Sequence, residues 1–130
     1  MNELRHHISL DKLEIYQLSR ELSRTAWKVY DGLGWDDKKI TGQQFIRSVD
    51  SVGANIAEGY YRYHYLDKIK FYYNARASLR EANNHWLELL RERDRIDQVT
   101  YSQFKQTAEV LSVKLNNFIA VTYKQKLKKQ

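Results

Sequence analysis

The amino-acid sequence predicts an all-α protein, a single domain of four helices packed as an antiparallel up-down-up-down bundle. Apolar residues recur three or four positions apart in four separate segments, and no run alternates as a half-buried strand would. Proline is absent, so that helix breaker interrupts none of these segments. Short connections join them, which favours antiparallel neighbours. A chain of 130 residues is long enough for one core and too short for two.

The first helix is expected over residues 10–33. Its apolar positions fall three or four apart: Ile15, Leu18, Leu22, Ala26, Val29 and Leu33. Ser9 offers a hydroxyl that can cap the start of this helix, and Gly32 with Gly34 supplies the stop. Residues 1–8 are expected to be irregular.

The second helix is expected over residues 42–59, after a polar connection at residues 35–40. Thr41 offers a cap, with Gln44 three residues on, which is the capping-box spacing. The core stripe is Phe45, Val49, Val52 and Ile56. Gly53 costs about 1 kcal/mol relative to alanine inside a helix, so its presence indicates a close packing contact there.

The third helix is expected over residues 65–94, with the stripe Tyr72, Ala75, Leu79, Ala82, Trp86 and Leu89. The fourth is expected over residues 101–124, introduced by a second capping-box spacing from Thr100 to Gln103. Its stripe is Phe104, Ala108, Leu111, Leu115, Phe118 and Thr122. Residues 124–130 are expected to form an irregular basic tail.

Positive charge is concentrated at the end of the chain. The formal net charge is +6, and residues 95–130 hold seven basic and two acidic side chains, a net +5. The chain ends in four closely spaced lysines, Lys124, Lys126, Lys128 and Lys129. Such a tail attracts polyanions, although solvated basic termini without a partner are also common.

No reaction centre is evident. The chain has no cysteine, no Gly-x-Ser-x-Gly turn and no glycine-rich phosphate loop. The only Glu-x-x-His spacing is Glu3 to His6, while Glu81 and His85 have no second histidine on a helix to complete a metal pocket. The sequence therefore predicts a protein without catalytic residues, metal or cofactor. No stretch approaches the roughly 18 apolar residues of a membrane helix, and a cytoplasmic location is expected.

An aromatic run occupies residues 60–65, and cations lie within it and after it at Arg62, Lys68 and Lys70. Aromatic rings interleaved with cations can stack bases and hold phosphates, at about 1–3 kcal/mol per stacked base. The alternative is that these tyrosines cover one end of the bundle or fill a subunit interface.

Some apolar side chains lie beside the core stripes. Either they are exposed to solvent in the monomer and form a subunit interface, or the core is wide enough to bury them. The candidates for a subunit interface are Trp27, Tyr61, Tyr63 and Val113.

Glu58 and Arg76 are predicted to form a structural ion pair between the second and third helices. Glu58 lies near the C-terminus of its helix, where the helix dipole disfavours an anion, so a compensating cation is expected. Arg76 lies at the edge of the next helix's stripe. The alternative is that Arg76 grips a ligand.

These residues belong to segments that resemble a known family, the 23S rRNA intervening-sequence proteins, also called S23 ribosomal proteins. The resemblance covers residues 10–123. It begins at Leu13-Glu14-Ile15-Tyr16-Gln17-Leu18 and is most specific at Asn55-Ile56-Ala57-Glu58-Gly59. It continues through Ala75-Arg76-Ala77-Ser78-Leu79-Arg80-Glu81. Gly53-Ala54 departs from the family's usual Pro-Ser or Pro-Ala, and Arg47 and Asp50 replace a frequent pair of arginines.

The resemblance implies an antiparallel four-helix bundle that assembles as a ring-like homopentamer, with a biochemical role largely unknown. A related branch, the accessory variability proteins of diversity-generating retroelements, binds a reverse transcriptase and nucleic acid. Three hypotheses follow, and the third and weakest of them is a small-molecule pocket in the ring or bundle. In the first, a non-enzymatic homo-oligomer binds RNA or DNA through its basic surface. In the second, the chain is a protein-interaction adaptor, such as an accessory subunit of a nucleic-acid enzyme.

Overall fold

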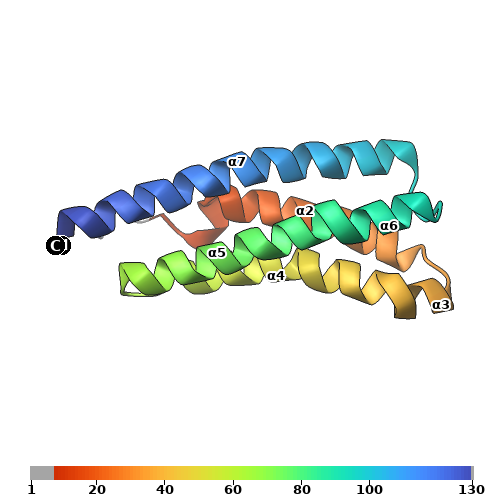
Figure 1. The fold of residues 1–130 in the computed structure, drawn as a ribbon, viewed down its shortest axis with the longest axis horizontal. Helices are drawn as coiled ribbons and strands as arrows, with labels where there is room; N and C mark the ends of the chain where they lie inside the picture. The colour runs from red at the N-terminus through yellow and green to blue at the C-terminus, as the bar shows by residue number, and fades with distance from the viewer. Residues whose placement is uncertain (1–7, 130) are drawn as a thin grey trace.

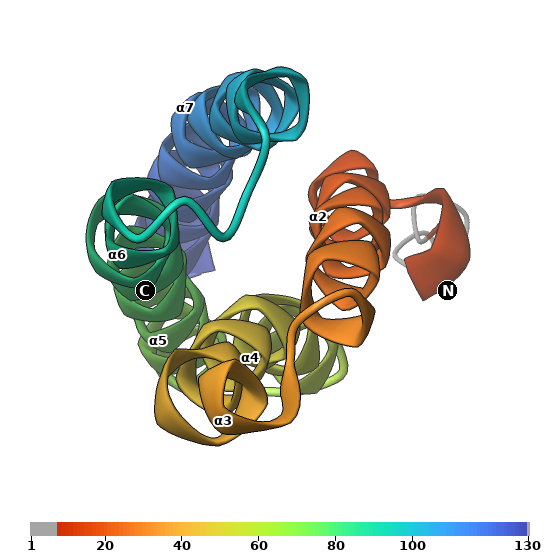
Figure 2. The same ribbon diagram turned by 90° about the vertical axis from the view of Figure 1, so that its right-hand side faces the viewer.

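The computed structural model of the protein describes residues 8–129. Four long helical stretches run side by side along one axis (Figure 1), and they form the corners of a bundle when viewed along that axis (Figure 2). Within the described residues there is no strand. The predicted all-α four-helix architecture is confirmed.

The first stretch is helix α2, Glu14–Asp31. It begins later than predicted, because Leu10–Lys12 form only a short 3-10 turn and Leu13 is extended, with φ −72° and ψ 121°. The Leu13 side chain is buried, whereas Ser9 makes no capping hydrogen bond. The helix ends at Asp31 with Gly32 as its C-cap, two residues before the predicted end at residue 33.

The second stretch begins at Trp35, so the predicted polar connection at residues 35–40 is wrong. Helix α3, Trp35–Asp37, runs through a π-helical turn, Lys38–Gly42, into helix α4, Gln43–Tyr60. The chain instead reverses at Gly32–Gly34, where Gly34 is extended at ψ 166°. Thr41 is therefore not a cap. It is buried inside the π turn, and its hydroxyl oxygen accepts a hydrogen bond from Arg93 Nη1 at 2.5 Å.

The third stretch contains a second π-helical turn that changes which residues face the core. Helix α5, Tyr65–Glu81, leads through the π turn Ala82–Trp86 into helix α6, Leu87–Glu92. The predicted core positions Trp86 and Leu89 are only half-buried, and Leu87 and Leu90 are fully buried instead. A π turn adds one residue, which rotates everything after it by about 100° relative to an unbroken α-helix.

The fourth stretch is helix α7, Gln98–Lys129, and it is longer at both ends than predicted. The predicted Thr100 cap is wrong, because Asp97 is the capping residue. Asp97 accepts a hydrogen bond from the Thr100 backbone N–H at 2.8 Å and from its hydroxyl at 2.9 Å. These bonds lower the pKa of the Asp97 carboxyl. Helix α7 continues to Lys129, so the expected irregular tail is helical up to that residue.

The core is filled by the predicted stripes from all four stretches. Phe45, Val49, Val52 and Ile56 on α4 are each at most 1% exposed. Two aromatic contacts cross the core at different levels: Phe45 with Phe104, with ring centroids 5.4 Å apart, and Tyr72 with Phe118, at 5.2 Å. The second contact lies near the turn between α4 and α5.

Two glycines on α4 allow neighbouring helices to approach closely. A Cβ atom at Gly53 would lie 2.9 Å from Ser19 Oγ, which confirms the close contact expected there. A Cβ atom at Gly59 would lie 2.7 Å from Tyr72 Cε1 and 3.0 Å from Phe71 Cβ. Because the Tyr72 ring is buried in the core, it cannot move aside as a flexible side-chain end could.

Gly59→Ala is expected to destabilise the fold by up to about 2 kcal/mol, because overpacking costs about 1–3 kcal/mol and alanine's helix propensity returns about 1 kcal/mol. Urea unfolding measures the change. Gly34→Ala is the control, since no atom lies within 4 Å of its would-be Cβ. It should change the free energy of unfolding by less than about 1 kcal/mol. Equal effects of the two substitutions would contradict the close-approach explanation.

Candidate nucleic-acid interface

The C-terminal turns of α7 and the turn between α4 and α5 lie at the same end of the molecule, and α7 extends beyond that turn (Figure 1). We call this the basic end, defined by Lys124, Lys126 and Lys128 on α7 and by residues 60–70. Lys124 and Lys128 are exposed, and Lys126 Nζ lies 5.6 Å from the Tyr123 ring centroid. No acidic residue follows Glu109 in the sequence, so this part of α7 carries only positive side-chain charge.

The turn between α4 and α5 presents aromatic rings to solvent. Tyr61 is 70% exposed and Tyr63 is 88% exposed. Tyr60 and Tyr61 meet edge to face with ring centroids 5.4 Å apart, and Tyr63 and His64 do so at 5.1 Å. The structure therefore brings the aromatic turn and the α7 lysines to one end, two features that the sequence placed sixty residues apart.

The three cations around this turn, Arg62, Lys68 and Lys70, differ in the contacts they make within the protein. Arg62 forms an ion pair with Glu58 at 2.6 Å and lies 4.8 Å from the Phe71 ring centroid. Lys68 is half-buried, and its Nζ donates to the Tyr60 carbonyl at 2.7 Å and to the Gly59 carbonyl at 3.5 Å. It thereby satisfies carbonyl groups that the end of α4 leaves free. Lys70 is exposed on α5.

The predicted ion pair between Glu58 and Arg76 is wrong. Glu58 pairs with Arg62 one turn along the chain. Arg76 instead donates to Asn116 Oδ1 on α7 at 3.1 Å and lies 4.7 Å from the Tyr73 ring centroid. The turn from Tyr61 to His64 brings Arg62 back over the end of α4, which makes the local partner available before α5 begins.

The other polar residues of the motif segments make hydrogen bonds within and between helices. Asn55 donates to the Ser51 carbonyl at 2.8 Å and to the Ser51 hydroxyl at 3.0 Å. Ser78 on α5 donates to the same hydroxyl at 3.1 Å. Glu81 accepts a hydrogen bond from the Trp86 indole N–H at 2.6 Å across the π turn. These residues form polar contacts along α4, α5 and the π turn.

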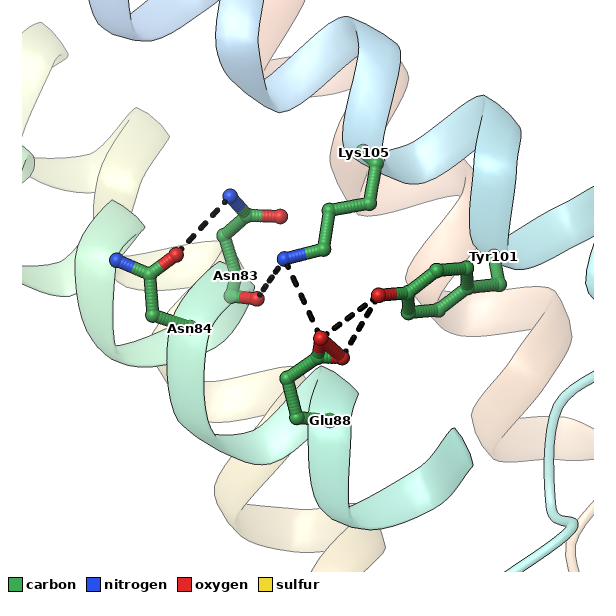
Figure 3. Close-up of polar contacts among 5 residues, drawn as sticks. All are labelled: Asn83, Asn84, Glu88, Tyr101 and Lys105. Atoms are coloured by element: carbon green, nitrogen blue, oxygen red, sulfur yellow. Dashed lines mark hydrogen bonds and ion pairs between the residues drawn. The ribbon is translucent and has the colours of Figure 1, made fainter. Parts of the chain in front are cut away.

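A further polar cluster, which no sequence pattern predicted, joins the π turn Ala82–Trp86 and α6 to α7 (Figure 3). Lys105 Nζ donates to the Asn83 carbonyl at 2.8 Å and lies 3.7 Å from Glu88 Oε1. Tyr101 donates its hydroxyl to the Glu88 carboxylate, with oxygen distances of 2.7 and 2.8 Å. This bond raises the pKa of Tyr101. A lysine that reaches a carbonyl in an irregular turn serves to hold that turn.

Burial also affects two residues near the basic end. It lowers the pKa of the Lys68 ammonium, and it raises the pKa of the Tyr72 hydroxyl above its ordinary value of 10.0. Among residues 8–129, no three His, Cys, Asp or Glu side chains gather where they could hold a metal ion. Glu3 and His6 lie outside the described residues. Within the described chain, no helix is long and apolar enough to cross a membrane.

The interface candidates Trp27 and Val113 are 55% and 61% exposed on α2 and α7. Because more than half of each side chain is exposed, neither residue belongs to the core, and the alternative of a wide core stripe does not apply to them. Other exposed apolar side chains on α7 include Val99, Val110, Val121 and Leu127.

Comparisons with known proteins agree with this architecture. A family model described as 23S rRNA-intervening sequence protein matches residues 11–117. The crystal structure of a protein of unknown function from the S23 ribosomal protein family of Bacteroides thetaiotaomicron VPI-5482 is similar, with a TM-score of 0.76 and 25% identity. The match covers 86% of this chain and 99% of that one. A search of curated proteins finds no match. The family match ends before Lys124.

Lys105→Met is expected to destabilise the protein by about 1–3 kcal/mol, because it leaves a carbonyl and a carboxylate without their cation. Lys114→Met is the matched control on the same helix. Lys114 forms only an exposed ion pair with Glu14 at 2.6 Å, and such pairs contribute about 0.2–1 kcal/mol. Thermal unfolding of both variants measures the difference, and equal losses would show that the cluster does not hold the π turn.

Proposed function

This chain belongs to the 23S rRNA-intervening sequence protein family, and we propose that it is a non-enzymatic homo-oligomeric bundle that binds RNA or DNA through its basic end. One observation carries this proposal. The lysines of α7, which the sequence predicts as nucleic-acid contacts, lie at the same end of the bundle as the exposed tyrosines of the α4–α5 turn, which it predicts either to stack bases or to fill a subunit interface.

The chemistry of the basic end suits a phosphate backbone. Lys124, Lys126 and Lys128 follow the last acidic residue of the chain, Glu109, by fifteen positions or more, so no carboxylate on α7 neutralises them. Lysines near a helix C-terminus are also stabilised by the helix dipole, which accounts for part of their placement without any ligand. Lysine side chains that stay exposed can release counterions from phosphates, which gives salt-sensitive and largely sequence-independent binding.

Self-association would strengthen such binding. The resemblance implies a homopentamer, and joining five basic ends in one particle raises avidity for a long polyanion without any new contact. The exposed apolar side chains Trp27 and Val113 support an interface on α2 and α7, because exposed apolar surface often marks a subunit contact. Such a nucleic-acid partner would favour a location in the bacterial cytoplasm.

The lysines are tested by reversing three charges, Lys124→Glu, Lys126→Glu and Lys128→Glu. The matched control reverses three exposed arginines elsewhere on the bundle, Arg24, Arg47 and Arg80, so that both variants have the same net charge. Affinity for a generic RNA is measured against salt concentration. The lysine variant should lose most of the affinity, and its salt slope should fall by about 0.7–0.9 for each phosphate contact removed.

Equal losses in the two triple variants would show that net charge alone, and not the basic end, determines binding. No binding by the parent protein at low salt, or affinity that salt does not change, would refute the nucleic-acid function. The protein-interaction adaptor would then be the hypothesis to pursue.

The assembly is tested by Val113→Asp, which should shift the protein toward its monomer mass of 15.6 kDa in sedimentation, because a buried carboxylate would be stranded at the interface. Val99→Asp is the control. It makes the same change on the same helix at a similarly exposed valine, 67% against 61%, and should leave the mass unchanged. A parent protein that sediments as a monomer would rule out the homo-oligomer.

A further inference from the structure

The basic end contains a hollow of about 510 Å³ that opens between α4, α5, α7 and the segment before α2, which contributes Ile8 and Leu13. Aromatic and aliphatic side chains form most of its lining, and the aromatic ones are Tyr60, Tyr65, Tyr72 and Phe118. Lys68, Thr122 and Gln125 supply polar groups, while the Tyr60 hydroxyl already donates to the Ile8 carbonyl. Pockets that bind small organic groups have this character: a volume of roughly 300–1,000 Å³, mostly apolar and aromatic walls, and few polar groups.

The polar groups of the hollow have capacity for a ligand. The Lys68 ammonium uses two of its N–H donors on carbonyl groups of α4, which leaves the third. Tyr72 is 1% exposed and lies in the lining, and a tyrosine hydroxyl can both donate and accept a hydrogen bond. Gln125 can both donate and accept. Donors and acceptors amid aromatic rings match the edge and the faces of a nucleobase.

The hollow is continuous with the lysines of α7. Val121 and Gln125 line it and lie one turn apart on α7. Lys124 and Lys128 follow each of them by three residues, so they lie on the same face of the helix. A chain whose base enters the hollow would therefore have its phosphates beside these two lysines.

We propose that the hollow binds one unstacked base of a single-stranded RNA or DNA, and so makes the basic end selective for single strands over duplexes. This proposal rests on the proposed nucleic-acid function and names its substrate class. A duplex cannot fill the hollow without first unpairing and unstacking a base, whereas a single strand offers its bases freely.

The test plugs the hollow. Val121 is 51% exposed, so Val121→Trp can fill the opening without entering the core, and Ala120→Trp places the same ring on the neighbouring exposed position outside the lining. Binding of a short single-stranded RNA and of a duplex of the same length is measured for each full-length variant. Val121→Trp should weaken single-strand binding about 5- to 150-fold, the effect of one lost stacked base, and leave duplex binding within about twofold. Ala120→Trp should change neither.

Tyr65→Leu provides a second variant, because it removes one ring of the lining from a half-buried position while keeping much of its volume. Thermal unfolding checks that each variant is folded. If both pocket variants bind the single strand as the parent does, the base pocket is wrong while the nucleic-acid function stands. If the parent binds neither RNA, both proposals fail. A free mononucleotide that binds as tightly as the strand would assign the hollow to small nucleotides and overturn its role in strand selection.

Discussion

The close approach of α4 and α5 at Gly59 determines the geometry of the basic end. Because Gly59 has no side chain, the Tyr72 ring lies directly against α4 and closes the core there with Phe118. The same closeness lets Lys68, one turn before Tyr72 on α5, reach the last carbonyl groups of α4. A bulkier residue at this position would push the helices apart, and the hollow, the lysine contact and the short aromatic turn would all change together.

Much of the fold follows from the sequence because apolar periodicity records which face of each helix is buried. The stripe on α4 is correct at every position. On the third helix it is correct through Ala82 and then fails, because the periodicity cannot show that a π turn has added a residue. Thr41 and Thr100 were plausible caps by spacing, but hydrogen bonding to Arg93 and to Asp97 decides their roles. The Arg93 contact depends on tertiary structure, because Thr41 and Arg93 lie far apart in the sequence, whereas Asp97 lies only three residues before Thr100 and competes with it locally for the capping position.

The candidate site was harder to predict, because charge composition does not show which lysines and arginines are already engaged in hydrogen bonds or ion pairs within the protein. Lys68 and Lys105 bind carbonyl groups, Arg62 and Arg95 pair with Glu58 and Asp37, and Arg76 binds Asn116. The lysines at the end of the chain were expected in an irregular tail, whereas the structure carries them on α7 with Lys124 and Lys128 exposed. The hollow could not be predicted, because its lining combines side chains from three helices and from the segment before α2. No sequence pattern shows how closely these elements pack against one another.

The π turn at Ala82–Trp86 accommodates one more residue than an unbroken α-helix would need between the same core positions. Leu87 and Leu90 lie five and eight residues after Ala82, whereas an ordinary α-helix would place the next two core positions four and seven residues on. Removing one residue between Ala82 and Leu87 would therefore give an unbroken helix with the same two leucines in the core. The turn corresponds to a single-residue insertion that the helix absorbs locally, and the Asn83 carbonyl bound by Lys105 lies inside it. Relatives with an unbroken helix at this place should be one residue shorter there.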